Sequence, residues 1–168
     1  NSGSKNRGRN QSFTNLGVED LLGLSEHYSL GYRTSLGNAQ NNFMRSYSTS
    51  FSLPFGYNNF SLYYNSANYR TFIETPRNKY TNKGGSKVAK INIDRIVHRD
   101  GNSKTNIATS IGSDNYSNYI ADNKIEMATY RIHKFDLKIG HQRRLESSAI
   151  SFNLIYTGGE NQNYSAKL

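Results

Sequence analysis

Apolar and polar residues alternate along much of this chain, and a period of two is that of a β-strand with two different faces. In residues 45–55, every second position from 46 to 52 is a serine, and aromatic, β-branched or aliphatic residues stand between the serines. The same alternation predicts further strands over residues 9–19, 27–35, 58–66, 87–97, 103–113, 133–141 and 149–157.

The segments between these strands differ in length. Short connections are expected at 21–26, 56–59, 100–103 and 145–148, and longer polar ones at 35–42, 73–86 and 114–130. Short turns alternating with long loops predict an antiparallel up-and-down meander. With strands of about ten residues, this asymmetry is typical of outer-membrane β-barrels.

Composition decides which face would be buried. Only 35% of the 168 residues are hydrophobic and the mean hydropathy is -0.78, with no Trp and no Cys. No amphipathic helix is available to cover a sheet, and no run of about 18 apolar residues could cross a bilayer as a helix. A barrel with its apolar face on lipid and its polar face on a wet lumen explains how so polar a chain folds.

The alternation assigns individual residues to these faces. Residues expected to face the lumen are Arg33, Ser46, Ser48, Ser50, Ser52, Lys90, Asn92, Asp94, Lys134, Asp136 and Lys138. Residues expected to face lipid are Phe51, Leu53, Leu62, Ile91, Ile93, Phe135, Leu137, Ile139, Phe152 and Leu154. Aromatic residues near strand ends suit interfacial girdles, among them Phe43, Tyr47, Phe55, Tyr57, Phe60, Tyr69 and Tyr119. A soluble sandwich or lipocalin-like barrel is the alternative, because charged residues suit its outer face equally well.

Other chemistry finds little support in the sequence. The triplet HRD at 98–100 occurs in protein kinases, but the Asn required five residues later is Thr105 here. The histidines have no metal-ligand spacing, so we expect no metal site, no cofactor and no catalytic residue. The net charge is +9, but the basic residues are spread over many segments, and we expect no nucleic-acid partner.

Several stretches, in their order and spacing, resemble the barrel domain of two-partner-secretion transporters of the haemolysin secretion/activation type. The family's Asn-Ser-Gly-Ser hairpin and Gly-Arg strand start resemble the opening NSGSKNRGRN. Its Asp-Asn-Pro-Leu-Gly-Leu-Gly-Asp turn resembles EDLLGLSE at 19–26, with Leu21 in place of the proline. Its serine-rich strand, Pro-aromatic-Gly turn and Tyr-Arg strand end resemble SFSLPFGYNNFSLYYNSANYR, and its Arg-Asp turn and Lys-Thr strand start resemble HRDGNSKTN.

The resemblance implies an all-β fold that forms about half of a sixteen-stranded transmembrane barrel. Residues 1–168 would be one partial barrel domain with roughly strands two to nine, cut from a longer chain. Two periplasmic POTRA domains, the plug loop and the closing strands would lie outside it.

The resemblance also implies a function. The barrel would be a pore in the bacterial outer membrane that exports a large adhesin or haemolysin, delivered unfolded, and would not be an enzyme. Membrane lipid and lipopolysaccharide would surround it. The alternatives are another insertase-type or porin-like outer-membrane barrel and a soluble adhesin-like β domain.

Overall fold

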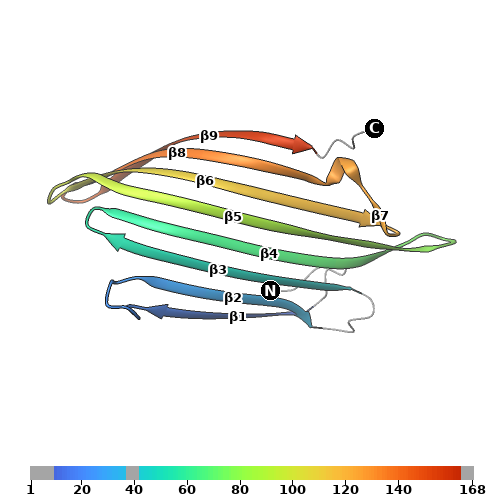
Figure 1. The fold of residues 1–168 in the computed structure, drawn as a ribbon. Helices are drawn as coiled ribbons and strands as arrows, with labels where there is room; N and C mark the ends of the chain where they lie inside the picture. The colour runs from blue at the N-terminus through green and yellow to red at the C-terminus, as the bar shows by residue number, and fades with distance from the viewer. Residues whose placement is uncertain (1–9, 37–41, 164–168) are drawn as a thin grey trace.

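The computed structural model describes residues 10–36 and 42–163, which form one antiparallel sheet (Figure 1). Its strand order is β1-β2-β3-β4-β5-β6-β8-β9, and the short β7 pairs with β6. The strands are β1 (Asn10–Glu19), β2 (His27–Leu36), β3 (Phe43–Phe55), β4 (Asn58–Glu74), β5 (Lys79–Arg99), β6 (Ser103–Ile120), β7 (Asn123–Lys124), β8 (Tyr130–Arg144) and β9 (Ala149–Asn163). The predicted all-β meander is confirmed.

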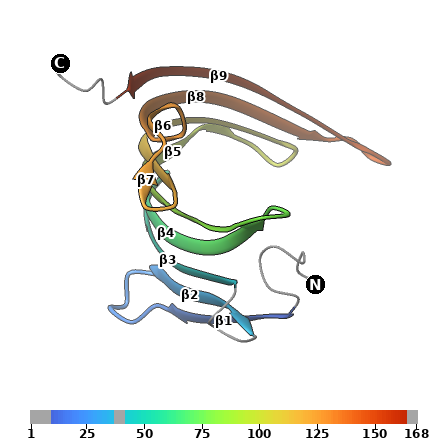
Figure 2. The same ribbon diagram turned by 90° about the vertical axis from the view of Figure 1, so that its right-hand side faces the viewer.

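The sheet curls into an open arc, with β1 at one end and β9 at the other (Figure 2). The arc has almost no apolar interior, since Ala108 is the only buried hydrophobic residue in the described part of the chain. A soluble domain of this size normally encloses a core of many apolar side chains. Backbone pairing between neighbouring strands therefore carries most of this fold.

Helical structure in the described ranges is limited to one 3-10 turn, η1 (Glu126–Ala128), between β7 and β8. None of the helical segments among residues 10–36 and 42–163 has the length and apolar character needed to cross a membrane.

The predictions of long loops over residues 73–86 and 114–130 are wrong. β4 continues to Glu74 and β5 begins at Lys79, so the connection expected over 73–86 is a tight turn at 75–78. β6 likewise continues to Ile120, and only 121–129 of the expected loop 114–130 lies between β6 and β8, where it holds β7 and η1. The predicted loop 35–42 lies mostly outside the described residues.

The reason is that β4, β5 and β6 lose their apolar alternation before they lose their pairing. Residues 65–68 (NSAN), 82–87 (NKGGSK) and 113–118 (SDNYSN) are polar on both faces, which reads as loop in sequence. These residues still pair with the neighbouring strand in an unbroken register, from Asn65↔Val88 to Arg70↔Lys83. Strand pairing therefore does not require an apolar face.

Candidate functional site

The strand registers place every residue predicted for the lumen on one face of the sheet. Antiparallel partners share a face, and one row of partners runs from Ser52 through Ser61, Asn92 and Ser110 to Asp136. Alternation along each strand adds the remaining members, which are Arg33, Ser46, Ser48, Ser50, Lys90, Asp94, Lys134 and Lys138. We call this surface the polar face.

The residues predicted to face lipid all lie on the opposite surface, which we call the apolar face. One row of partners runs from Phe51 through Leu62, Ile91 and Ile111 to Phe135. Its side chains are open to the surroundings, with Ile91 51% and Ile111 58% exposed. The neighbouring rows of the apolar face hold Leu53, Ile93, Leu137, Ile139, Phe152 and Leu154.

Side chains on the polar face bond across intervening strands. Asp136 Oδ2 accepts hydrogen bonds from Lys90 Nζ at 2.9 Å and from Ser110 Oγ at 2.8 Å, and Oδ1 accepts one from Thr157 Oγ1 at 3.0 Å. These groups come from β5, β6, β8 and β9, so one carboxylate joins four strands. Ser110 is buried, while the apolar face is exposed. We therefore place the polar face on the concave side of the arc, where side chains converge.

On the polar face, Tyr69 and Asn118 approach each other across β5, and this approach requires a glycine at position 84. Tyr69 on β4 donates its hydroxyl hydrogen to Asn118 Oδ1 on β6 at 2.5 Å, passing over β5 at Gly84. A Cβ built on Gly84 would lie 2.5 Å from Asn118 Oδ1 and 2.8 Å from Tyr69 Cε1. Tyr69 therefore belongs to the polar face, and its expected place in an aromatic girdle on the lipid side is wrong.

The polar network extends to residues that sequence reasoning missed. Lys134 Nζ donates to Asp114 Oδ2, and Asn106 Nδ2 donates to Asp94 Oδ2 at 2.7 Å. Asp114 is buried although the predicted strand ends at residue 113. The sequence did contain a signal for Asp114, because every second residue of a strand lies on the same face. Continuing the predicted strand past residue 113 puts Asp114 on the same face as Ser110.

In the β1–β4 part of the polar face, hydrogen bonds between serine and asparagine side chains join neighbouring strands. Ser29 Oγ donates to Asn15 Oδ1 at 3.0 Å, and Asn65 Nδ2 donates to Ser46 Oγ at 3.1 Å. Arg33 lies over the Phe13 ring, with its Cζ 5.3 Å from the ring centroid. The short serine side chains leave this half of the concave surface open.

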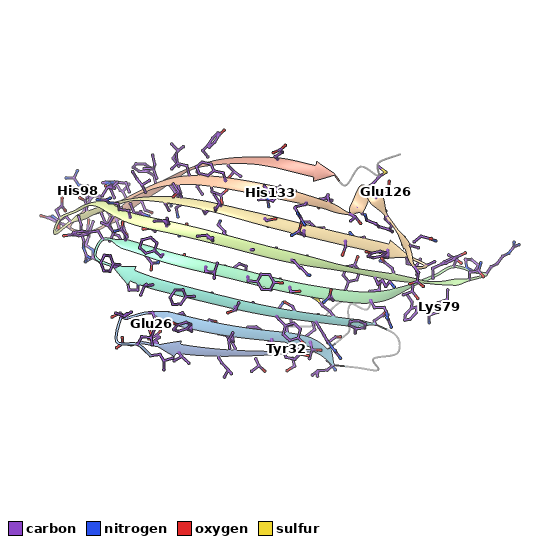
Figure 3. The ribbon with its side chains drawn as sticks, viewed as in Figure 1. Glu26, Tyr32, Lys79, His98, Glu126 and His133 are labelled. Carbon is purple, nitrogen blue, oxygen red and sulfur yellow. The ribbon has the colours of Figure 1, made fainter. Side chains whose placement is uncertain are left out.

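The turns outside the sheet carry two organised carboxylates. Burial of Glu26, labelled in Figure 3, raises the pKa of its carboxyl, but hydrogen bonds from Leu22 N and Leu24 N outweigh burial and hold that pKa below its usual range. In the β5–β6 turn, the backbone N–H groups of Asn102 and Ser103 hold the pKa of Asp100 far below its usual range. Both carboxylates therefore stay charged and fix their turns.

The described residues hold no group of three or more His, Cys, Asp or Glu side chains that could bind a metal ion. His98 lies near one end of β5 and His133 along β8 (Figure 3). The arrangement instead offers a polar surface on one side of the sheet and a band of exposed apolar side chains on the other.

The sequence of this chain is similar to those of known proteins. The family model of the haemolysin secretion/activation protein ShlB/FhaC/HecB matches residues 1–164. Outer membrane transporter CdiB of Dickeya dadantii (strain 3937) is 24% identical over 159 residues, which are 95% of this chain and 28% of the relative. Hemolysin transporter protein ShlB of Serratia marcescens is 23% identical over 154 residues, 92% of this chain and 28% of the relative. The chain thus spans less than a third of the length of these curated relatives.

Two solved structures share the fold. CdiB from Escherichia coli superposes with a TM-score of 0.90 at 21% identity, over 95% of this chain and 30% of that one. CdiB from Acinetobacter baumannii superposes with a TM-score of 0.78 at 22% identity, over 90% of this chain and 28% of that one. The predicted family resemblance is confirmed by the match over nearly the whole chain: this chain belongs to the ShlB/FhaC/HecB family of haemolysin secretion/activation proteins.

Proposed function

We propose that this chain forms part of the wall of an outer-membrane pore that exports a large partner protein by two-partner secretion. One observation carries the proposal: from β3 to β8, the registers put a band of exposed apolar side chains on one side of the sheet and a hydrogen-bonded polar surface on the other. A chain with one buried hydrophobic residue among those described gains stability from an apolar solvent on its convex side. The apolar face would meet lipid and the polar face a water-filled lumen.

The position of the apolar band supports membrane insertion. The row of partners that begins with Leu16 and Leu30 ends with His133 and Glu160 on β8 and β9. On β9 the apolar residues lie nearer the β8–β9 turn, ending with Ile150. An apolar band that crosses the strands obliquely is expected when strands tilt about 35–45° from the membrane normal.

The proposal also covers the complete barrel, of which this chain would be a part, and its place in the outer membrane. The relatives are named outer membrane transporters and hemolysin transporters, which supports an outer-membrane location and a secreted partner for this chain. Residues 1–168 would supply roughly strands two to nine of about sixteen, with POTRA domains and closing strands elsewhere in the protein. The partner would cross unfolded past the serines of the β1–β4 half and the charged groups of the β5–β9 half.

Single cysteines test the assignment of the two faces, because residues 1–168 contain no cysteine. In the full-length protein in intact outer membranes, Ser48→Cys should react with a water-soluble maleimide and Leu62→Cys should not. Deletion of the gene should also remove one large protein from the culture medium, and the intact gene should restore it. Equal labelling of both cysteines, or an unchanged set of secreted proteins, would contradict the proposed function.

A further inference from the structure

We propose that the apolar face carries a binding site for a phosphorylated glycolipid of the outer leaflet, with the chemistry of the lipid A part of lipopolysaccharide. The site consists of a polar hollow beside Lys87 and Arg131 and an apolar groove next to it. It rests on the proposed function, because it requires this face to lie in the membrane. The end of the sheet with the β4–β5 turn would point outward.

The polar hollow lies on the apolar side of the sheet, beyond the band of aliphatic residues. It has a volume of about 280 Å³. Lys87, Asn115 and Arg131 are register partners, so the two basic residues flank Asn115 on neighbouring strands. None of the described residues that line the hollow is acidic: they are Asn68, Gly85, Ser86, Lys87, Asn115, Tyr116, Ser117, Thr129, Tyr130 and Arg131.

The geometry of the hollow suits a phosphate and sugar hydroxyls. Lys87 and Arg131 stand two strand spacings apart, about 9–10 Å, and both side chains are long enough to meet over Asn115. Lys87 is exposed, and Arg131 is oriented by the hydrogen bond that its Nε donates to Asn115 Oδ1. Gly85 carries no side chain, and the Asn68 amide lies over it, with Oδ1 2.6 Å from the place that a Cβ of residue 85 would take. Paired cations bind phosphate, and amide and hydroxyl groups bind sugar hydroxyls.

The apolar groove starts one step along the same strands. Ala89 follows Lys87 on the same face of β5, and His133 separates Arg131 from Phe135 on β8. The groove has a volume of about 620 Å³, and its lining includes the small residues Ala89 and Gly158 among larger apolar ones. Its main apolar lining is Leu62, Ala89, Ile91, Ile111, Phe135 and Gly158. Glu160, the one carboxylate of the lining, stands beside His133 at the rim.

Together these surfaces fit an amphiphile with acyl chains and an anionic sugar head. Acyl chains would follow the groove, and a head group would occupy the hollow at the edge of the aliphatic band. Phosphatidylethanolamine fits less well, since its own ammonium group would be repelled by Lys87 and Arg131. A bisphosphorylated disaccharide offers phosphates to both cations and hydroxyls to Asn68 and Asn115.

The test uses the full-length transporter, purified in detergent and titrated with hexa-acylated bisphosphorylated lipid A by native mass spectrometry. The double substitution Lys87→Gln with Arg131→Gln should weaken binding at least about tenfold. Ala89→Trp fills the groove without changing charge and should also weaken binding. The control, Arg33→Gln with Lys138→Gln, removes the same charge from residues of the polar face that line neither the hollow nor the groove, and it should bind as the wild type does. Heat-modifiable migration on gels verifies that each variant is folded.

Three results would overturn the site. The first is an equal loss of lipid A binding in the double variant and in its control. The second is binding of lipid A that is no tighter than binding of phosphatidylethanolamine or dephosphorylated lipid A. The third is displacement of lipid A by inorganic phosphate together with unchanged binding by Ala89→Trp. A transporter that folds and exports its partner but gives any of these results leaves the proposed function standing. A protein that fails to insert into the outer membrane would overturn both.

Discussion

On the polar face, side chains of different strands bond to one another, whereas on the apolar face they lie exposed beside one another. Asp136 joins four strands through Lys90, Ser110 and Thr157. On the opposite surface, contacts between neighbours are mainly rings and aliphatic chains, such as Tyr28 and Phe51 with ring centroids 4.8 Å apart. In the proposed barrel, lipid would cover the apolar face, while the polar face supplies hydrogen-bond partners of its own. The same strands would then meet two solvents.

The largest effect should come from placing a charge on the apolar face. In the full-length protein, Leu137→Arg should cost about 2–4 kcal/mol if residue 137 lies near the bilayer midplane, because its guanidinium must enter hydrocarbon. The neighbouring Lys138→Gln, on the polar face, should cost little, since its side chain remains in water. Urea unfolding in lipid vesicles measures both. The reverse order of stability would mean that the two faces are assigned backwards.

The next largest difference in stability should come from adding one methyl group to a glycine of the polar face. On the polar face, a Cβ at Gly84 would lie 2.7 Å from Ser117 O and 2.8 Å from Tyr69 Cε1. Gly84→Ala should therefore break the Tyr69–Asn118 hydrogen bond and cost about 1–3 kcal/mol.

The matched control for this substitution lies on the apolar face. A Cβ at Gly158 meets only Tyr156 Cε1 at 3.8 Å and Tyr156 Oη at 3.9 Å, which are ordinary contacts. Gly158→Ala should leave the unfolding midpoint of the full-length protein nearly unchanged. If the two substitutions lower the unfolding midpoint equally, side chains on the polar face are not packed more closely than those on the apolar face.

Much of this comparison could be predicted from the sequence, because alternation alone assigns residues to faces. Every residue expected in the lumen shares one face with Ser52 and Asp136, although the registers of β5 with β6 and of β6 with β8 were unknown. The bonds themselves could not be predicted. Lys90 meets Asp136 across β6 only because the registers bring positions 46 residues apart together. The polar halves of β4 to β6 were missed, since backbone pairing leaves no hydropathy signal there.

A smaller effect is expected from removing the carboxylate that joins the strands. Asp136→Ala leaves the buried Ser110 hydroxyl without its acceptor and should cost about 1–2 kcal/mol in urea unfolding of the full-length protein. Asp122→Ala, which breaks the ion pair of Lys83 with an exposed carboxylate in the loop, should cost less because water screens that pair. Equal costs would mean that the polar network adds no stability beyond that of an exposed ion pair.

The smallest effect concerns ion permeation through the proposed lumen. Lys90 and Lys134 are paired with Asp136 and Asp114, so the excess positive charge of this wall falls mainly to Arg33 and Lys138. Charged linings favour counter-ions, and we expect this wall to favour anions in the full-length transporter in planar bilayers, with the plug displaced. Changing Lys90, Lys134 and Lys138 together to Glu should shift the reversal potential toward cation preference.

Two further variants test whether the shift in reversal potential comes from charges that line the water path rather than from charges elsewhere on the protein. Lys138→Glu alone should give about a third of the shift, because each of the three substitutions lowers the charge of the wall by two units, whether or not the lysine is paired with an aspartate. Lys83→Glu changes charge equally on the apolar side and should leave the reversal potential unchanged, since Lys83 lies in register with Arg70 and Tyr119 there. An unchanged potential in the triple variant would mean that these side chains do not line the water path, and residues 87–97 and 133–141 would need the opposite orientation.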